Sequence, residues 1–274
     1  MEFRLKGRID LEATLFSGQS FVWERAENGF STEILGGARA RQLGDGICLE
    51  IADEARLPAW REYFDLDADY GERLAPVMDA PLAAAIAHCP GLRMLRQPFY
   101  STLCGFILSS NNNIPRIMGL MRKLEGLATK EGFPMPEEIL AAGEERLRQM
   151  GMGYRARYIH GSARLMAGGF NWQALRDMDY ESAKKALMTL PGVGGKVADC
   201  VLLFAVGHSQ AFPVDVWMER ALKGWYGLSG SPEALRRQAV ERFGAQAGLA
   251  QNFLFHYART GPEFRRGASP GAAV

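Results

Sequence analysis

The sequence predicts an α+β fold, in which an N-terminal antiparallel β-sheet domain is followed by an all-α domain. Short apolar–polar alternations separated by glycine turns run through residues 3–15, 20–35 and 38–51, as is typical of strands and hairpins. From Ala55 onward the apolar residues recur at helical spacing, first in residues 57–74, and glycine and proline divide the rest of the chain into helices. We therefore predict a sheet domain over residues 1–80 and a helical domain over residues 81–274.

The composition indicates a globular protein without a general affinity for polyanions. The 274 residues are 47% hydrophobic and 23% charged, with a net charge of +1, so a nucleic-acid surface would need locally placed Arg and Lys. Four widely separated cysteines without metal-ligand spacing predict reduced, mostly buried thiols: Cys48, Cys89, Cys104 and Cys200. No apolar run approaches the ~20 residues of a membrane span, and the N-terminus lacks a signal sequence. An intracellular soluble protein is the default expectation.

Two turns punctuate the first half of the chain. Residues 17–21 form a small-residue turn ahead of an aromatic strand, and the residues alone favour an ordinary turn. Residues 92–116 predict a long apolar helix that ends at three asparagines before Ile114 and Pro115. Three asparagines can simply end a helix, but they also form a short polar finger whose amides both donate and accept.

The second half carries a glycine-hinged aromatic followed by cations. Tyr154 precedes Arg155 and Arg157 at the start of a predicted helix. Cations at a helix N-terminus oppose the helix dipole, so this pattern favours a phosphate or base partner.

A glycine hairpin over residues 190–194 separates predicted helices over 181–188 and 195–206. Its glycines let consecutive backbone N–H groups turn outward beside a helix N-terminus, which suits a phosphate. Lys196 lies one turn into the second helix, and Cys200, four residues later, shares its face. Asp215 is the predicted N-cap of a helix over residues 216–225. Taken singly, these features are ordinary: a loop between helices, a solvated lysine and a cap.

The last predicted helix, over residues 250–259, places Gln251 and Phe255 four residues apart on one face. A phenylalanine there is usually part of the core, and a glutamine beside it usually lies at the surface. Four histidines show no shared ligand spacing and are predicted to be structural or at the surface: His88, His160, His208 and His256.

Together these motifs resemble the helix-hairpin-helix glycosylase superfamily with its Gly-Pro-Asp loop, and Lys196 with Asp215 resembles its 8-oxoguanine DNA glycosylase branch. The resemblance runs from about Leu11 to Arg259 through five separated motifs in the same order, without the iron–sulfur loop of some relatives. It implies that the helical domain is a helix-hairpin-helix glycosylase domain. It also implies a bifunctional 8-oxoguanine DNA glycosylase and AP lyase that acts on duplex DNA, preferentially opposite cytosine.

The resemblance assigns the chemistry to two residues. Lys196 is the expected nucleophile, which forms a Schiff base through which β-elimination cuts the strand, and Asp215 assists the developing cationic sugar. We expect Asp215 to be held by its helix-cap bonds rather than by a tight salt bridge to Lys196. No metal or organic cofactor is expected, although the family is compatible with a monovalent ion on the hairpin carbonyls.

The remaining site residues follow from the same resemblance. Four are expected to contact the extruded base, through the Gly18 carbonyl, the faces of Cys200 and Phe255, and the amide of Gln251. Seven are expected to contact DNA: Asn111, Arg116 and Arg155 at the orphaned cytosine, Tyr154 as a wedge, and Gly192, Gly194 and Trp217 near the backbone. Trp217 departs from the family, which often has a phosphate-binding histidine there, since an indole offers one donor and no charge.

Two alternatives stay open at this point. A monofunctional glycosylase for alkylated bases on the same fold would need Asp215 without Lys196. A non-catalytic helix-hairpin-helix DNA-binding module would explain the hairpin but not the coincidence of Lys196, Asp215, Gln251 and Phe255. For the enzyme we expect a monomer, in the cytoplasm with the nucleoid or in a eukaryotic nucleus.

Overall fold

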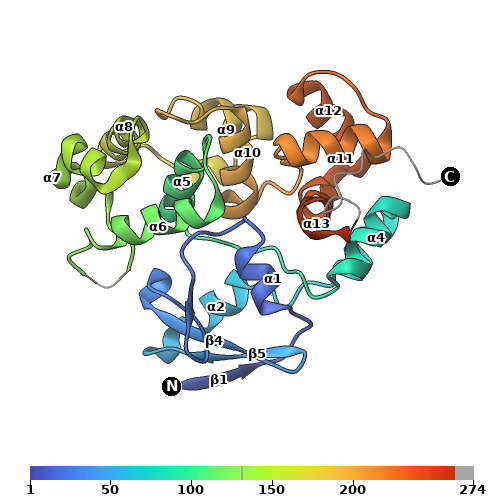
Figure 1. Ribbon diagram of the computed structural model, residues 1–274, viewed down its shortest axis with the longest axis horizontal. Coiled ribbons are helices and arrows are strands. Elements are labelled where there is room, and N and C mark those ends of the chain that lie inside the picture. The colour runs from blue at the N-terminus through green and yellow to red at the C-terminus, as the bar shows by residue number, and fades with distance from the viewer. Residues whose placement is uncertain (131, 263–274) are drawn as a thin grey trace.

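The computed structural model describes residues 1–130 and 132–262, and it confirms the predicted α+β class (Figure 1). A five-stranded antiparallel sheet with strand order β1-β5-β4-β3-β2 lies at one end of the molecule. Its strands are β1 (Glu2–Leu5), β2 (Glu24–Ala26), β3 (Gly29–Thr32), β4 (Ala38–Leu43) and β5 (Gly46–Glu50). The register pairs Leu5 with Ile47 and Ala40 with both Phe30 and Leu49.

The sheet packs beneath two helices, α1 (Leu11–Phe16) and α2 (Leu57–Tyr63) (Figure 1). Trp23, Trp60, Tyr63 and Phe64 form a fully buried aromatic cluster, and the Trp23 indole donates to the Tyr63 hydroxyl at 2.8 Å. The cluster buries a large apolar area, and this bond gives the buried Trp23 N–H the partner that such a donor needs.

The strand prediction over residues 3–15 is wrong in part, because Leu11–Phe16 is a helix. The Asp10 side chain caps it by accepting from the Ala13 amide at 2.9 Å. Its buried residues, Leu11, Thr14 and Leu15, recur at helical spacing, so the helical period prevails over the apparent alternation. The predicted aromatic strand is shorter too, since β2 begins only at Glu24.

The long helix predicted over residues 92–116 is also wrong in part, since α5 begins at Phe99 and ends at Leu108. Residues 92–98 run as an irregular segment, and Pro98 disfavours helical geometry at Gln97. The amides of residues 93–97 donate outside any helix, to Thr14 Oγ1, Tyr70 OH, Gln19 Oε1, Tyr63 O and Phe204 O in turn. These bonds tie the segment to both halves of the molecule.

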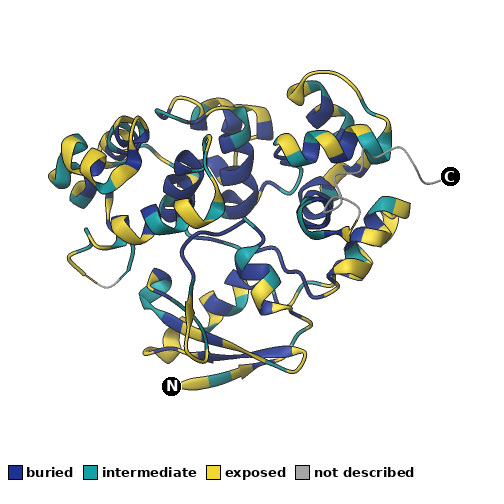
Figure 2. Ribbon diagram, viewed as in Figure 1, coloured by how far each residue is buried: buried dark blue, intermediate teal, exposed yellow. Residues whose placement is uncertain are grey.

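The rest of the described chain is mostly helical. After α3 (Tyr70–Leu74) and α4 (Ala80–His88) come α5 (Phe99–Leu108), α6 (Ile114–Glu125), α7 (Pro136–Leu147), α8 (Arg155–Ala167), α9 (Tyr180–Leu187), α10 (Gly195–Val201), α11 (Val216–Tyr226), α12 (Pro232–Phe243) and α13 (Ala247–Thr260). Figure 2 shows the most deeply buried helical surfaces at the centre, around α5 and α10. The two helices predicted to flank the hairpin are α9 and α10, and α10 continues as a π-helical turn over Leu202–Val206.

None of the described helices is long and apolar enough to cross a lipid bilayer. All four cysteines are buried and free, as predicted.

Candidate active site

Lys196 lies in the first turn of α10, directly after the hairpin, and is half-buried. Its Nζ lies 3.4 Å from Ser109 Oγ, in the turn that follows α5, and 5.3 Å from the centroid of the Phe106 ring. No carboxylate in the described residues forms an ion pair with it. The amine thus sits at an apolar wall with a single weak hydrogen bond.

Asp215 is the N-cap of α11, as predicted. Its Oδ1 accepts from the amides of Trp217 and Met218, both at 3.0 Å. These two bonds orient the carboxylate independently of Lys196, yet both residues line the same pocket. The structure therefore has the arrangement expected from the sequence, a carboxylate held by its cap beside an unpaired lysine.

The pocket between them collects every residue predicted to contact the base. It is lined by Gly18, Gln19, Phe106, Lys196, Cys200, Phe204, Pro213, Asp215, Gln251, Asn252 and Phe255. Its enclosed free volume is about 30 Å³, and the pocket is continuous with a wider opening past Gly18, Asp215 and Phe255.

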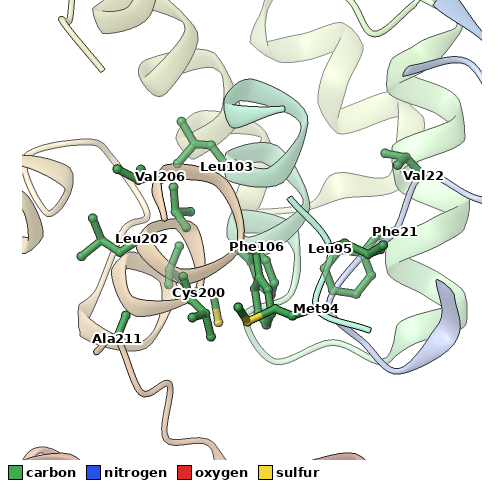
Figure 3. Close-up of a cluster of buried hydrophobic side chains, with 14 of the residues drawn as sticks. Phe21, Val22, Met94, Leu95, Leu103, Phe106, Cys200, Leu202, Val206 and Ala211 are labelled. Carbon is green, nitrogen blue, oxygen red and sulfur yellow. The ribbon is translucent and has the colours of Figure 1, made fainter. Parts of the chain in front are cut away.

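Cys200 forms one wall of the pocket, and Figure 3 shows its sulfur in a hydrophobic cluster with Phe106 and Met94. Burial raises the pKa of the Cys200 thiol to about 12, although Lys196 acts in the opposite direction. The thiol is therefore neutral at physiological pH, a polarisable surface rather than a nucleophile.

The other walls come from α13. Gln251 is 4% exposed and its Nε2 donates to the Pro213 carbonyl at 3.1 Å, which fixes the orientation of the amide. Phe255 is half-buried one turn later. Asn252, which the sequence analysis did not single out, is 1% exposed, and its Nδ2 has no partner in the described residues.

A wider groove of about 780 Å³ opens from this pocket. One side is the turn over residues 109–113, which we call the asparagine turn. The other sides are the hairpin, the start of α11, and Gly18, Phe255 and Arg259. The groove brings together several residues predicted to contact DNA: Asn111, Gly192, Gly194 and Trp217. Arg116 is exposed on α6 without a partner in the described residues, but it does not line the groove.

Tyr154 and Arg155, two residues predicted to contact DNA, anchor the asparagine turn. Asn111 is exposed in a left-handed conformation with φ 48°. The Arg155 guanidinium is 4% exposed and donates to the Ser110 carbonyl and, at 2.9 Å, to the Asn111 carbonyl. Tyr154 is 42% exposed, and its hydroxyl donates to the same Ser110 carbonyl at 3.3 Å. In this structure Arg155 holds the backbone of the turn rather than facing solvent.

The hairpin packs against one neighbouring helix, α8. Gly192 has φ +81°, and a Cβ there would lie 2.7 Å from Tyr158 Cβ and Cγ. The Ser162 hydroxyl donates to the Pro191 carbonyl at 2.9 Å. Gly194 is exposed as the N-cap of α10. The start of that helix is thus open to an anion.

A buried ionic cluster supports the hairpin from behind. Lys184 on α9 lies 3.1 Å from the Asp199 carboxylate on α10 and 3.2 Å from that of Glu233 on α12. Burial raises the pKa of Asp199 to about 6, against the opposing effect of Lys184. The cluster ties together the two helices that the hairpin joins.

Sequence reasoning missed Arg259, Ser109, Gln19 and Asn252. Arg259 had a signal, since it lies one turn after Phe255 on the same face of α13. Ser109 lies next to the asparagines and Gln19 next to Gly18, but nothing else in the sequence pointed to them. Their hydrogen-bond partners, Lys196 and Leu95, lie far away in the sequence.

Comparison with known proteins agrees with this geometry. The profile described as HhH-GPD superfamily base excision DNA repair protein matches residues 104–245, and that of the 8-oxoguanine DNA glycosylase N-terminal domain matches residues 4–103. An Arabidopsis thaliana protein named N-glycosylase/DNA lyase OGG1 is 34% identical over 72% of this chain and 56% of its own length. A Saccharomyces cerevisiae N-glycosylase/DNA lyase is 31% identical over 91% of this chain and 83% of its own length.

Solved structures give the same result. The Clostridium acetobutylicum 8-oxoguanine glycosylase/lyase, in complex with duplex DNA containing cytosine opposite 8-oxoG, is 29% identical with a TM-score of 0.87, covering 94% of this chain and 97% of that one. The two profiles together cover both halves of the fold, and residues from both regions line the pocket, such as Gly18 from the first and Lys196 from the second. The chain therefore belongs to the HhH-GPD superfamily of base excision DNA repair proteins and, within it, to the 8-oxoguanine DNA glycosylases.

Proposed function

We propose that this protein is a bifunctional DNA glycosylase and AP lyase that removes 8-oxoguanine from duplex DNA, preferentially opposite cytosine, in base excision repair. The observation that carries the proposal is the shared pocket of Lys196 and Asp215, in which the carboxylate is satisfied by its cap and the lysine has no ion-pair partner among the described residues. The protein acts as a monomer, in the compartment that holds the DNA of the cell.

The reaction begins with extrusion of the damaged nucleotide, since C1′ is inaccessible within the stack. The neutral Lys196 amine attacks C1′, and the N9–C1′ bond breaks with its electron pair leaving on the base, which takes up a proton. Loss of a proton from the amine and opening of the sugar give a Schiff base between Nζ and C1′. Removal of a C2′ proton then expels the 3′ phosphate by β-elimination.

Asp215 supports the first step electrostatically. Positive charge develops on the sugar as the base leaves, and a fixed carboxylate beside it stabilises that charge. A carboxylate that paired tightly with Lys196 would favour the ammonium form, which has no lone pair for attack. The cap bonds from Trp217 and Met218 keep the carboxylate available for the sugar.

The pocket recognises the base by its shape, by the Gln251 amide and by the Gly18 carbonyl. The Cys200 sulfur and the Phe255 ring suit the two faces of a planar purine, and Gln251 suits its Watson–Crick edge. Oxidation at C8 turns N7 from an acceptor into an N–H donor, so the Gly18 carbonyl gains a hydrogen bond with the lesion and meets a lone pair in guanine. Such an unmet contact is worth about 1 to 3 kcal/mol.

On the opposite strand, the asparagine turn fills the gap that the base leaves. Orphaned cytosine presents acceptors at N3 and O2, which suit Asn111 and the arginines Arg116 and Arg155. The exposed Tyr154 wedges into the stack, and the hairpin, whose Gly192 and Gly194 line the groove, binds a phosphate. Trp217 adds a contact at the groove without adding charge.

Borohydride trapping on an 8-oxoguanine duplex tests the chemistry, because only an enzyme that passes through a Schiff base becomes covalently linked. We expect wild type to trap and Lys196→Gln to bind the lesion duplex without releasing the base or trapping. Lys223→Gln is the matched control, since Lys223 is an exposed lysine on α11 paired with Glu219. Full trapping by Lys196→Gln would place the nucleophile elsewhere, and base release without trapping by wild type would favour a monofunctional enzyme.

Single-turnover excision opposite each of the four bases, at one salt concentration, tests the cytosine preference. Thymine presents an N3 donor to an arginine, so excision should be slower opposite thymine than opposite cytosine. Equal rates opposite all four bases would remove the assignment of Asn111, Arg116 and Arg155.

A further inference from the structure

The Gly18 turn has an unusual pattern of carbonyl partners. The Ser17 carbonyl accepts from Arg259 Nη1, and the Gln19 carbonyl accepts from Gln97 Nε2 at 2.6 Å. No donor in the described residues reaches the Gly18 carbonyl between them. Of three successive carbonyls, the two outer ones are therefore held by the protein, and the middle one, which belongs to a residue lining the pocket, is left for a ligand.

Arg259 makes a second contact at the same wall. Its Cζ lies 5.3 Å from the centroid of the Phe255 ring, within the range of a cation–π interaction. A Cβ on Gly18 would lie 3.1 Å from Arg259 Nη1 and 3.4 Å from Phe255 Cε1, so the three residues are in close contact. The planar guanidinium can bind a carbonyl and stack on a ring at once, which a lysine ammonium cannot do as well.

The charge of Arg259 persists in this half-buried place. Burial lowers the pKa of Arg259 from its ordinary range, and the Asp215 carboxylate acts against that shift. Arginine is not deprotonated in proteins, so Arg259 remains a charged donor, and charged hydrogen bonds are the stronger kind.

We propose that Arg259 is a positioning residue for lesion recognition, which fixes the Gly18 carbonyl by binding the carbonyl before it and bracing the Phe255 ring. The inference rests on the proposed function, since it concerns how the same pocket tells 8-oxoguanine from guanine. Arg259 does not touch the reacting atoms. Its effect is on discrimination and passes through Gly18 and Phe255.

The test measures discrimination by binding, so that it does not depend on turnover. In the Lys196→Gln background, affinity is measured for two duplexes that differ only in 8-oxoguanine or guanine opposite cytosine. Adding Arg259→Met should lower the preference for the lesion, which is the ratio of the two affinities, about tenfold, the order that loss of one charged hydrogen bond gives. Arg259→Lys keeps the charge without the stack and should lose only part of the preference.

Arg242→Met is the matched control. Arg242 also lies over an aromatic ring, with Cζ 4.9 Å from the Tyr226 centroid, but it lines neither the pocket nor the groove. It should leave the preference unchanged. If Arg259→Met does not fold, full preference in Arg259→Lys at wild-type stability overturns the proposal.

Two further outcomes also overturn it. Full preference in folded Arg259→Met means that Gly18 holds its place without the arginine. An equal loss of affinity for both duplexes, with a shallower dependence on salt, means that Arg259 contacts a phosphate instead. If the Lys196→Gln background itself shows no preference for 8-oxoguanine, then the proposed base recognition fails, and this inference fails with it.

Discussion

Two glycine turns face the pocket and groove, and they are held in opposite ways. The hairpin around Gly192 and the turn around Gly18 both need positive φ, +81° and +98° respectively. The hairpin presents backbone N–H groups at a helix start, which suits an anion, whereas the Gly18 turn offers a carbonyl, which suits a donor.

The hairpin is held mainly by its own neighbours in sequence. The Leu190 amide donates to the Leu187 carbonyl at 3.0 Å, and the Val193 amide donates to the Leu190 carbonyl at 3.1 Å. One helix, α8, packs against it through Tyr158 and Ser162. The phosphate binding proposed for the hairpin requires a local backbone shape, and these local bonds provide that shape.

The Gly18 turn depends on partners far along the chain. Arg259 is 242 residues from Ser17, and Gln97 is 78 residues from Gln19. The Gln19 side chain in turn donates to the Arg93 carbonyl at 2.8 Å. The proposed reading of one hydrogen on a base requires a carbonyl that is held against walls from other elements, and the tertiary contacts of this turn meet that requirement.

Gly192→Ala should have the largest effect. A left-handed backbone costs an alanine about 1 to 2 kcal/mol, and displacing Tyr158 costs about as much again, so unfolding should become easier by about 3 kcal/mol. Affinity for duplex should fall whether or not a lesion is present. The checks are urea unfolding and binding to undamaged DNA.

Gly194→Ala is the control for this prediction. Gly194 has φ −93°, and a Cβ there would meet nothing within 4 Å. The control applies to stability: a similar loss of unfolding free energy in both variants would show that strain at Gly192 is not the cause.

Lowering the pH should destabilise the folded protein through His256, which lies between Phe255 and Arg259 in the sequence of α13. Burial, with smaller contributions from His88 and Arg259, lowers the pKa of His256 from 6.5 to about 4. Between these values the unfolded chain binds a proton that the folded protein does not, so stability falls as pH falls through this window. One pKa unit is about 1.4 kcal/mol, so the shift at His256 lowers the free energy of unfolding by up to about 3 kcal/mol as pH falls through this window.

Urea unfolding of wild type and His256→Gln from pH 7 to pH 4 measures this contribution. The free energy of unfolding of wild type minus that of His256→Gln should decrease as pH falls. Asp199, behind the hairpin, has a pKa raised from 3.8 to about 6 and therefore favours the folded state more at low pH, so the difference between wild type and Asp199→Asn should move the other way. A pH-independent difference for His256→Gln would contradict the assignment.

Gly18→Ala should have a smaller effect on stability but a selective one on function. The left-handed backbone costs alanine about 1 to 2 kcal/mol, but the nearest atoms are ends of the Arg259 and Ile114 side chains, which can move. Excision of 8-oxoguanine should slow by about ten- to a hundredfold as its hydrogen bond is lost, while binding to undamaged duplex persists.

An analogue that keeps the C8 oxygen but lacks the N7 proton sharpens this test. Wild type should excise it about as slowly as Gly18→Ala excises 8-oxoguanine. If wild type excises the analogue as fast as 8-oxoguanine, the Gly18 carbonyl does not read the base.

Ser162→Ala should have the smallest effect. Its hydroxyl holds the Pro191 carbonyl from α8, and one neutral hydrogen bond is worth about 1 kcal/mol. Because the hairpin is held locally, duplex affinity should stay within about twofold of wild type. A large loss of affinity would show that the hairpin needs α8 as much as the Gly18 turn needs its distant partners.

Features that depend on residues close together in the chain could be predicted from the sequence. The hairpin between two helices, Asp215 as an N-cap and Lys196 with Cys200 on one face follow from glycine conformation, capping and helical period, which act over a few residues. The separation of sheet and helices followed from the same local periods. Gln251 with Phe255 was placed on one helix face in the same way.

Which polar groups are free and which are hydrogen-bonded depends on tertiary contacts and could not be predicted from the sequence. The tertiary structure buried the Arg155 guanidinium against the asparagine turn, and it brought Arg259 to the Ser17 carbonyl. It also kept residues 92–98 out of a helix, because five successive amides found partners on other elements. A hydrogen bond between residues 242 apart leaves no periodic trace in either segment, since each partner meets the other only after the core between them has packed.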